Sequence, residues 1–295
     1  MGKSRLVSDL RPWPARATWL LLPFTAGPAL ADGLAGRSHD VRWTVALLLW
    51  VGWTLTLVAL LVPRTISLTV LRVLAPTALV ATGWAALTGG RLGFGDVLAV
   101  GSAALAVAAA FSPLTGDVFV DGSSYGPERR MALRAPTALL LGPLPLTWLA
   151  AVAGASAGPL LLGAHRWAAG AAVIVVGAVI ARFAVRSLHQ LSRRWIVFVP
   201  AGMVLHDPLD QPEPTLFLRR SVRRLGPAHA DTTALDLTRG AFGLALQLDL
   251  IEPIDMLVRR GRSGAEKVTV NALLFTPTRP GALLDEARSR RIPVS

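Results

Sequence analysis

Hydrophobic residues form long runs in the first two thirds of the chain and alternate with polar residues in the last third. A helix that crosses a bilayer needs about 20 mainly apolar residues. Five runs meet this length clearly, and a sixth is interrupted by two prolines and an acid. The five lie at 43–62, 67–87, 96–114, 136–158 and 167–188, and the sixth lies at 17–34. The pattern predicts a tail over 1–16 and a transmembrane helical domain of about six spans over 17–189.

The segment 17–34 has a second interpretation. Four basic residues occur within the first 16 positions, and Ala29-Leu30-Ala31 has the small-residue pattern of a signal-peptidase site. Cleavage there would leave five spans. The basic stretch is long and proline-rich for a signal peptide, so the sequence favours a retained span.

The basic residues of the membrane part are unevenly divided between alternate loops. With the N-terminus placed inside, 13 Lys or Arg fall on the inner side and 4 on the outer side. The outer four are Arg37, Arg42, Arg91 and Arg166. Cytoplasmic loops carry the excess of Lys and Arg. We therefore expect a multi-pass protein of the bacterial cytoplasmic (inner) membrane with both termini in the cytoplasm.

Composition supports this division. Of the 295 residues 53% are hydrophobic and 16% are charged, against roughly 25% charged in an average soluble domain. This excludes a disordered chain, which would be polar and highly charged. The chain has no cysteine, so disulfides and thiolate metal sites are excluded. Residues 190–295 hold 26 of the 48 charges, which predicts a separate, soluble-like domain there.

That last third is predicted to be a small all-β domain. Leu244, Leu246, Leu248 and Leu250 alternate with Ala245, Gln247 and Asp249, a period typical of a strand with one buried face. Strands are expected at 194–200, 202–207, 215–225, 234–238, 243–250, 254–260 and 267–275, and an amphipathic helix at 280–291. We predict a cytoplasmic β-rich sandwich or barrel over 190–295, closed by a C-terminal helix.

This order of elements, directly after a transmembrane helix, resembles the bacterial pleckstrin-homology-like (PH-like) domains. The stretch RRWIVFVPAGMVLHDP at 193–208, with the loop GSSYGPERR at 122–130, is similar to a family of uncharacterised multi-pass membrane proteins of high-GC Gram-positive (actinobacterial) species. The resemblance implies no activity and no catalytic residue, because such folds host many functions.

The loop at 115–134 is the longest polar connection in the membrane part. It is either a solvated cytoplasmic loop that touches anionic lipid, or a docking loop that contacts the C-terminal domain or a partner. The docking residues would be Asp121, Tyr125, Glu128 and Arg129. Asp117 and Asp121 could offer oxygen ligands to a divalent cation, but this spacing is nonspecific and we predict no metal site.

Four arginines, Arg219, Arg220, Arg223 and Arg224, form the densest basic cluster. In a strand, alternate residues share a face, so the four would divide into two pairs. They are either the charges of a solvated edge strand or a contact surface for anionic lipid headgroups or for the acidic loop. Arg outnumbers Lys by 28 to 2, which we attribute to coding bias, so nucleic acid is not an expected partner.

Glycines recur in the last two spans, at Gly154, Gly158, Gly163, Gly170 and Gly177. Small residues let helix backbones approach closely. The spacing favours packing between helices of one chain over a homo-oligomeric contact.

No catalytic motif accompanies these features. The five histidines lack the spacing of a zinc site, and neither a nucleophile elbow nor a phosphate-binding Gly loop is present. No cofactor is expected. We therefore predict a non-enzymatic scaffold or regulatory protein whose β domain binds a protein partner or anionic lipid; the alternative is a transporter, channel or lipid-handling protein with a substrate path in the helical bundle.

Overall fold

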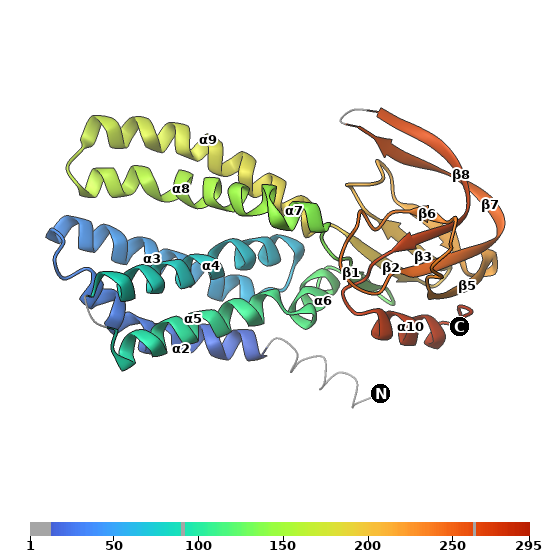
Figure 1. Ribbon diagram of the computed structural model, residues 1–295, viewed down its shortest axis with the longest axis horizontal. Helices are drawn as coiled ribbons and strands as arrows, with labels where there is room; N and C mark the ends of the chain where they lie inside the picture. Colours follow the sequence, from blue (N-terminus) through green and yellow to red (C-terminus); the bar gives the residue numbers. More distant parts are fainter. Residues whose placement is uncertain (1–12, 90–91, 262–263) are drawn as a thin grey trace. The chain divides into compact units, whose positions relative to one another are not determined.

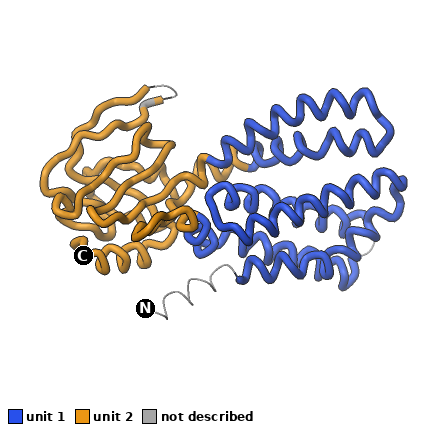
Figure 2. Tube along the Cα trace, turned by 180° about the vertical axis from the view of Figure 1, so that it is seen from behind, with its two compact units in different colours: residues 1–119, 145–189 blue, residues 120–144, 190–295 orange. Residues whose placement is uncertain are grey.

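The computed structural model describes residues 13–89, 92–261 and 264–295. The chain divides into two compact units, shown in different colours in Figure 2. The helical unit comprises Met1–Phe119 and Pro145–His189, and the β unit comprises Val120–Leu144 and Gln190–Ser295. The β unit therefore takes a segment from between the helices in addition to the C-terminal third.

Long helices make up the helical unit (Figure 1). They are α2 (Trp13–Gly33), α3 (His39–Leu61), α4 (Thr65–Thr88), α5 (Phe94–Phe111), α8 (Pro143–Gly163) and α9 (Trp167–Leu191). Five of them, α3, α4, α5, α8 and α9, are long and apolar enough to cross a membrane. This confirms the multi-pass helical architecture expected from the hydrophobic runs.

The sixth expected span, 17–34, corresponds to α2, which is less apolar than the other five helices. Pro23 and Pro28 lie inside it, and Asp32 is near its end. It is nevertheless packed within the helical unit, against α5 and α4. Trp19 and Trp53 join α2 to α3, because the indole N–H of each donates to the main-chain carbonyl of the other at 3.0 Å.

The expected span at 136–158 is split in two. A short helix, α7 (Thr137–Leu141), ends at Gly142, and α8 begins at Pro143 and continues to Gly163. Proline suits the first position of a helix, but it disfavours helical geometry in the residue before it. Gly142 accordingly leaves the helical region, with φ −137° and ψ −79°. The span therefore lies several residues later than predicted.

The glycines of the last two spans pack α8 against α9. A Cβ added to Gly154 would lie 2.6 Å from the carbonyl oxygen of Gly177, and one added to Gly158 would lie 2.8 Å from the nitrogen of Ile174. No side chain fits at these distances, so the two backbones touch directly. The interpretation as packing within one chain is confirmed for this helix pair.

Two four-stranded sheets and a helix form the β unit (Figure 1). Their orders are β1-β2-β3-β4 and β5-β7-β8-β6. The elements are β1 (Arg129–Ala132), β2 (Trp195–Val199), β3 (Gly202–His206), β4 (Thr215–Leu218), β5 (Val222–Pro227), β6 (Leu235–Asp236), β7 (Leu246–Arg260), β8 (Gly264–Phe275) and α10 (Pro280–Ser289). Neighbouring strands are antiparallel except β6 and β8. The predicted β-rich region with a final helix is confirmed.

Two strand predictions differ from the structure. The expected strand at 215–225 is interrupted by a short 3-10 helix, η1 (Arg219–Ser221), and its two halves β4 and β5 lie in different sheets. The expected strands at 243–250 and 254–260 form one long strand, β7, with a register shift between Asp249 and Ile254. Four residues of β7 lie between these two paired positions, whereas a single residue, Asn271, lies between their partners on β8.

Large apolar side chains fill the core of the β unit. Phe198, Phe217 and Phe275 are at most 1% exposed. Met131 and Leu133, from the segment between the helices, belong to the same buried cluster. This segment is thus part of the domain's core.

Candidate functional site

The loop between α5 and α7 supplies both a helix and a strand. Its first residues form α6 (Pro113–Asp121), and Arg129–Ala132 forms β1. Strand β1 pairs antiparallel with β2, with Arg129 opposite Phe198 and Ala132 opposite Trp195. The loop therefore contacts the C-terminal segment through main-chain pairing, which requires no particular side chain.

Two acidic residues of this loop, Asp121 and Glu128, bind groups within the loop. Asp121 forms an ion pair with Arg129 and accepts a hydrogen bond from the Arg130 main-chain N–H at 2.8 Å. Glu128 pairs with Arg130 at 3.3 Å. Tyr125 is 86% exposed. The ion pairs of Asp121 and Glu128 thus shape the loop itself and are not formed with the basic cluster of η1 and β5.

Within the described ranges, no group of three or more His, Asp or Glu side chains could hold a metal ion. Asp117, at 2% exposed, is buried in the helical unit, whereas Asp121 falls in the β unit.

The four arginines of the basic cluster have different surroundings. Arg219 and Arg220 lie in η1 and Arg223 and Arg224 in β5, so they do not form the two faces of one strand. The Nε of Arg224 donates to Asp249 at 2.9 Å. In the part of the chain that the structure describes, Arg219, Arg220 and Arg223 have no acidic partner, and all three are exposed. We call these three the arginine patch.

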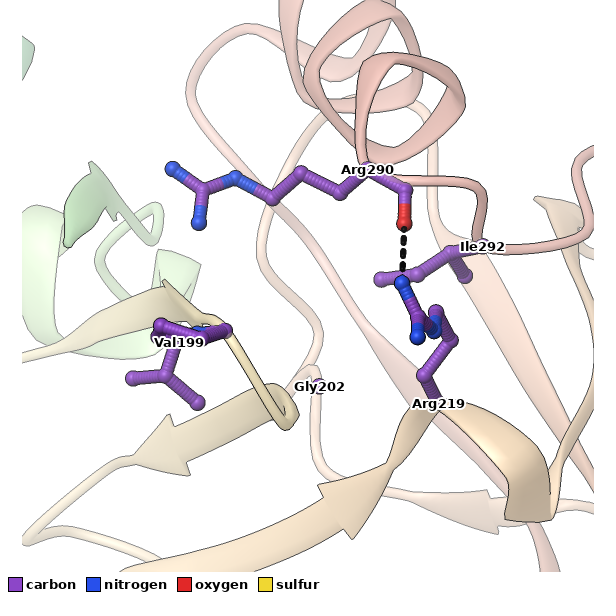
Figure 3. A pocket seen from close by; sticks show the side chains of 6 residues that line it. Val199, Gly202, Arg219, Arg290 and Ile292 are labelled. Carbon is purple, nitrogen blue, oxygen red and sulfur yellow. Dashed lines mark hydrogen bonds between the residues drawn. The ribbon is translucent and has the colours of Figure 1, made fainter. Parts of the chain in front are cut away.

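A small pocket of about 200 Å³ adjoins this patch (Figure 3). It is lined by Val199, Pro200, Gly202, Arg219, Arg290 and Ile292. The Arg219 side chain points toward the Arg290 carbonyl oxygen, at 3.5 Å, while the Arg290 side chain extends away from it. Ligand pockets for drug-sized molecules measure about 300–1,000 Å³. This one therefore suits a smaller group.

The two pocket arginines differ in charge balance. Arg290 donates to Glu286 at 2.6 Å and to the Pro127 carbonyl at 2.7 Å, so it ties α10 to the loop before β1. Its charge is neutralised by Glu286. Arg219 has only the weak contact with the Arg290 carbonyl, and its guanidinium remains able to bind an anion.

A buried ion pair, which sequence reasoning missed, lies elsewhere in the β unit. The Arg194 guanidinium donates to both carboxylate oxygens of Asp207, at 2.7 and 2.5 Å, and these side chains are 2% and 1% exposed. Arg194 also donates to the Arg134 carbonyl at 2.6 Å. Arg194 follows the last span, and Arg134 precedes α7. One buried side chain therefore joins two of the three segments that connect the β unit to the helices.

Asp210 extends this pair. Burial raises the pKa of Asp210 to about 6, and the nearby charge of Asp207 acts in the same direction, against the opposing effect of Arg239 and Arg194. Arg239 forms an ion pair with Asp210 and donates to the Leu209 carbonyl at 2.6 Å. No local pattern distinguishes the buried Arg194 from its half-buried neighbour Arg193, so the sequence carries no signal for this pair.

Comparison with known proteins finds no family model, no curated protein and no solved structure that the chain matches. The resemblance to PH-like domains and to an actinobacterial family therefore has no support from these comparisons. The helical unit with five membrane-length helices and the β unit with its final helix stand on the structure alone.

Proposed function

We propose that this chain is a non-enzymatic scaffold or regulatory protein of the bacterial cytoplasmic membrane whose cytoplasmic β unit binds the phosphate of anionic lipid headgroups. The observation that carries this is the arginine patch beside the small pocket. Guanidinium groups match phosphate geometry by donating two parallel hydrogen bonds.

The strength of such a contact fits a membrane-anchored domain. A basic residue near an anionic membrane surface gains about 1 kcal/mol, so the three arginines of the patch together supply about 3 kcal/mol. That is too weak to recruit a soluble protein stably. It is enough to orient a domain that its own spans already hold beside the bilayer.

The interior of the helical unit favours a scaffold over a transporter. Residues on the inner face of α5 are small and apolar: Ala99, Ala103, Ala106 and Ala110 are at most 3% exposed. An open hollow of about 720 Å³ is lined by residues including His39, Gly163 and Trp167, at the ends of α3, α8 and α9. The hollow therefore lies at one end of these helices. The substrate site of a transporter is expected near the middle of the membrane instead.

Helix α2 completes the proposed topology as a sixth span. Its 21 residues extend about 31 Å at 1.5 Å per residue, close to the thickness of a bilayer's hydrocarbon core. An even number of spans keeps the two ends of the chain on one side, and the basic inner segments make that side the cytoplasm.

The experiment compares two triple variants of the full-length chain in detergent. The first is Arg219→Gln, Arg220→Gln and Arg223→Gln; the matched control, which removes the same charge elsewhere on the β unit, is Arg259→Gln, Lys267→Gln and Arg288→Gln. Binding of short-chain phosphatidylglycerol and phosphatidylcholine is measured by native mass spectrometry.

The proposal expects the parent chain and the control to retain phosphatidylglycerol preferentially, and the patch variant to lose at least tenfold in affinity. Equal retention by both variants would refute lipid binding at the patch. Preserved lipid binding together with a protein that co-purifies only with the parent chain would assign the patch to a protein partner instead.

A further inference from the structure

The loop between β6 and β7 presents two hydrophobic side chains to the outside. Phe242 is 67% exposed and Leu244 is 49% exposed. Single exposed hydrophobic residues are common on soluble domains. These two, however, lie two residues apart in a glycine-rich segment, Arg239–Leu244. This segment contacts the part of the chain that leads into α8.

The conformation of this segment is well defined. Arg239, Gly240 and Gly243 have positive φ angles of 51°, 65° and 122°. The main-chain N–H of Ala241 donates to the Thr238 carbonyl at 3.0 Å, and that of Gly240 donates to the Thr238 hydroxyl at 3.2 Å. The ion pair of Arg239 with Asp210 anchors the start of the segment. Phe242 and Leu244 are thus held in place by their own loop.

Two contacts join this loop to the chain that leads into a span. The Thr137 hydroxyl donates to the Gly240 carbonyl at 2.6 Å. Gly243 lies against Arg134, because a Cβ at Gly243 would be 2.9 Å from the Arg134 Nε. Both partners precede α8, which begins at Pro143 and is apolar and long enough to cross a membrane. Pro143 belongs to the same compact unit as the loop.

The distance from the loop to the start of this span is short. Pro143 lies six positions after Thr137, and six fully extended residues cover about 20 Å. Because Thr137–Leu141 forms helix α7, the path is shortened to about 10 Å. Leu140 and Leu141, in α7, are also exposed, at 43% and 80%. The four exposed hydrophobic side chains thus belong to two segments, α7 and the β6–β7 loop, that the Thr137–Gly240 hydrogen bond joins.

We infer that Phe242 and Leu244, together with the exposed Leu140 and Leu141 of α7, insert into the interfacial region of the bilayer. The occupant is lipid because the loop is hydrogen-bonded to the segment that leads directly into the membrane-length helix α8. Aromatic and large aliphatic side chains partition into this region, as they do on the apolar face of interfacial helices. The contact fixes the orientation of the β unit at the membrane through a rigid loop. It rests on membrane insertion of α8 and needs no anionic headgroup.

A site-specific probe tests this in the full-length chain, which has no cysteine of its own. Phe242→Cys is labelled with an environment-sensitive fluorophore and reconstituted into liposomes; Leu244→Cys provides a second reporter. The control is Leu257→Cys, a 37% exposed position on β7 whose cross-strand neighbour is Lys267. Emission is quenched either by lipids with a nitroxide on the acyl chain or by aqueous iodide.

The inference expects lipid-borne nitroxide to quench the probe at 242 or 244 at least threefold more than the probe at 257, and iodide to show the reverse order. Iodide quenching at 242 and 244 equal to that at 257 would overturn it, since the loop would then lie in water. Protection from both quenchers would overturn it as well, since protein would then cover the loop. Repeating the measurement with the Gln variant of the arginine patch separates the two proposals, because insertion of the loop should persist when headgroup binding is lost.

Discussion

The two units differ in how many of their large apolar side chains are exposed, although the helical unit also buries Leu60, Leu68 and Leu71. In the helical unit the buried residues of α5 are alanines, while large residues such as Phe94 and Leu87 are 84% and 83% exposed. In the β unit Phe198, Phe217 and Phe275 are at most 1% exposed. Each unit is built for a different solvent. Water drives large apolar groups into a core, whereas lipid tails are as apolar as leucine and leave close packing of small residues to hold helices together.

This difference predicts which changes each unit tolerates. Enlarging a small residue between helices should be costly, and removing a large one from the β core should be costly. Truncating a large side chain on an exposed helix face, such as Leu105, should matter little.

The largest effect is expected from removing β1. A chain of residues 190–295 alone lacks Met131 and Leu133 of the β core, and truncating one large buried side chain costs about 2–5 kcal/mol. We therefore expect no cooperative thermal unfolding of this fragment by circular dichroism. The sequence predicts a separate domain over 190–295, without the residues 120–144 that the structure assigns to the same unit.

A matched chain restores the missing strand. Residues 120–135 joined to 190–295 by a flexible Gly/Ser linker should melt cooperatively. If the fragment without β1 melts as sharply as the joined chain, the segment is not a structural part of the domain.

Next in size is the buried ion pair of the β unit. Replacing Arg194 by Met leaves the Asp207 carboxylate buried without its partner, which costs about 3–5 kcal/mol. The double variant Arg194→Met with Asp207→Leu should recover most of this loss, because no charge is then buried alone. Both the loss of stability in the single variant and its recovery in the double variant are measured by the resistance of the β unit to proteolysis in the full-length chain. An equal loss of stability in the two variants would contradict this, and would mean that the hydrogen bonds of Arg194, not its charge, stabilise the β unit.

A smaller effect is expected where α8 meets α9. Gly154→Ala places a Cβ 2.6 Å from the Gly177 carbonyl, and overpacking of this kind costs about 1–3 kcal/mol. Gly101→Ala is the control, because nothing lies within 4 Å of a Cβ there. The midpoint of thermal unfolding in detergent should fall for the first variant only. A similar midpoint for both would count against close packing of these helices.

The smallest effect concerns pH. The pKa of Asp210 in the folded chain is about 6, above the ordinary 3.8, so the folded state binds more protons than the unfolded state between these values. The free energy of unfolding should therefore fall as pH rises from about 4 to about 6, and then level off. Asp210→Asn should remove this part of the pH dependence. Superimposable profiles of the parent and the variant, measured by urea unfolding, would contradict the assignment.

The parts of the fold predicted correctly are those that depend on local pattern. Membrane-length helices follow from apolar runs, and the β2–β3 hairpin follows from the adjacent β-rich stretches at 194–200 and 202–207, which the structure joins by a turn at Pro200-Ala201. Helix α10 follows from the spacing of Leu283, Leu284 and Ala287, all of which are buried.

The parts missed depend on contacts between distant segments. Strand β1 is four residues long and begins with two arginines, so only its pairing with β2 makes it a strand. The break at η1 arises because the chain passes from one sheet to the other there. For the candidate site, the sequence predicts the four arginines but not their partners. Arg224 pairs with Asp249, 25 residues away, which leaves Arg219, Arg220 and Arg223 without an acidic partner among the described residues.

The central claim, that the helical unit lies in lipid and the β unit in the cytoplasm, is tested most directly by labelling single cysteines with a membrane-impermeant maleimide. The three substitutions are Ser38→Cys, Leu105→Cys and Glu213→Cys. Ser38 lies between α2 and α3, Leu105 is a 63% exposed residue of α5, and Glu213 lies in the loop between β3 and β4. We predict labelling at 38 in intact cells, at 213 only in inverted membrane vesicles, and at 105 only after the membrane is dissolved and the chain unfolded. Labelling at 213 in intact cells, or at 105 in either membrane preparation, would contradict the account.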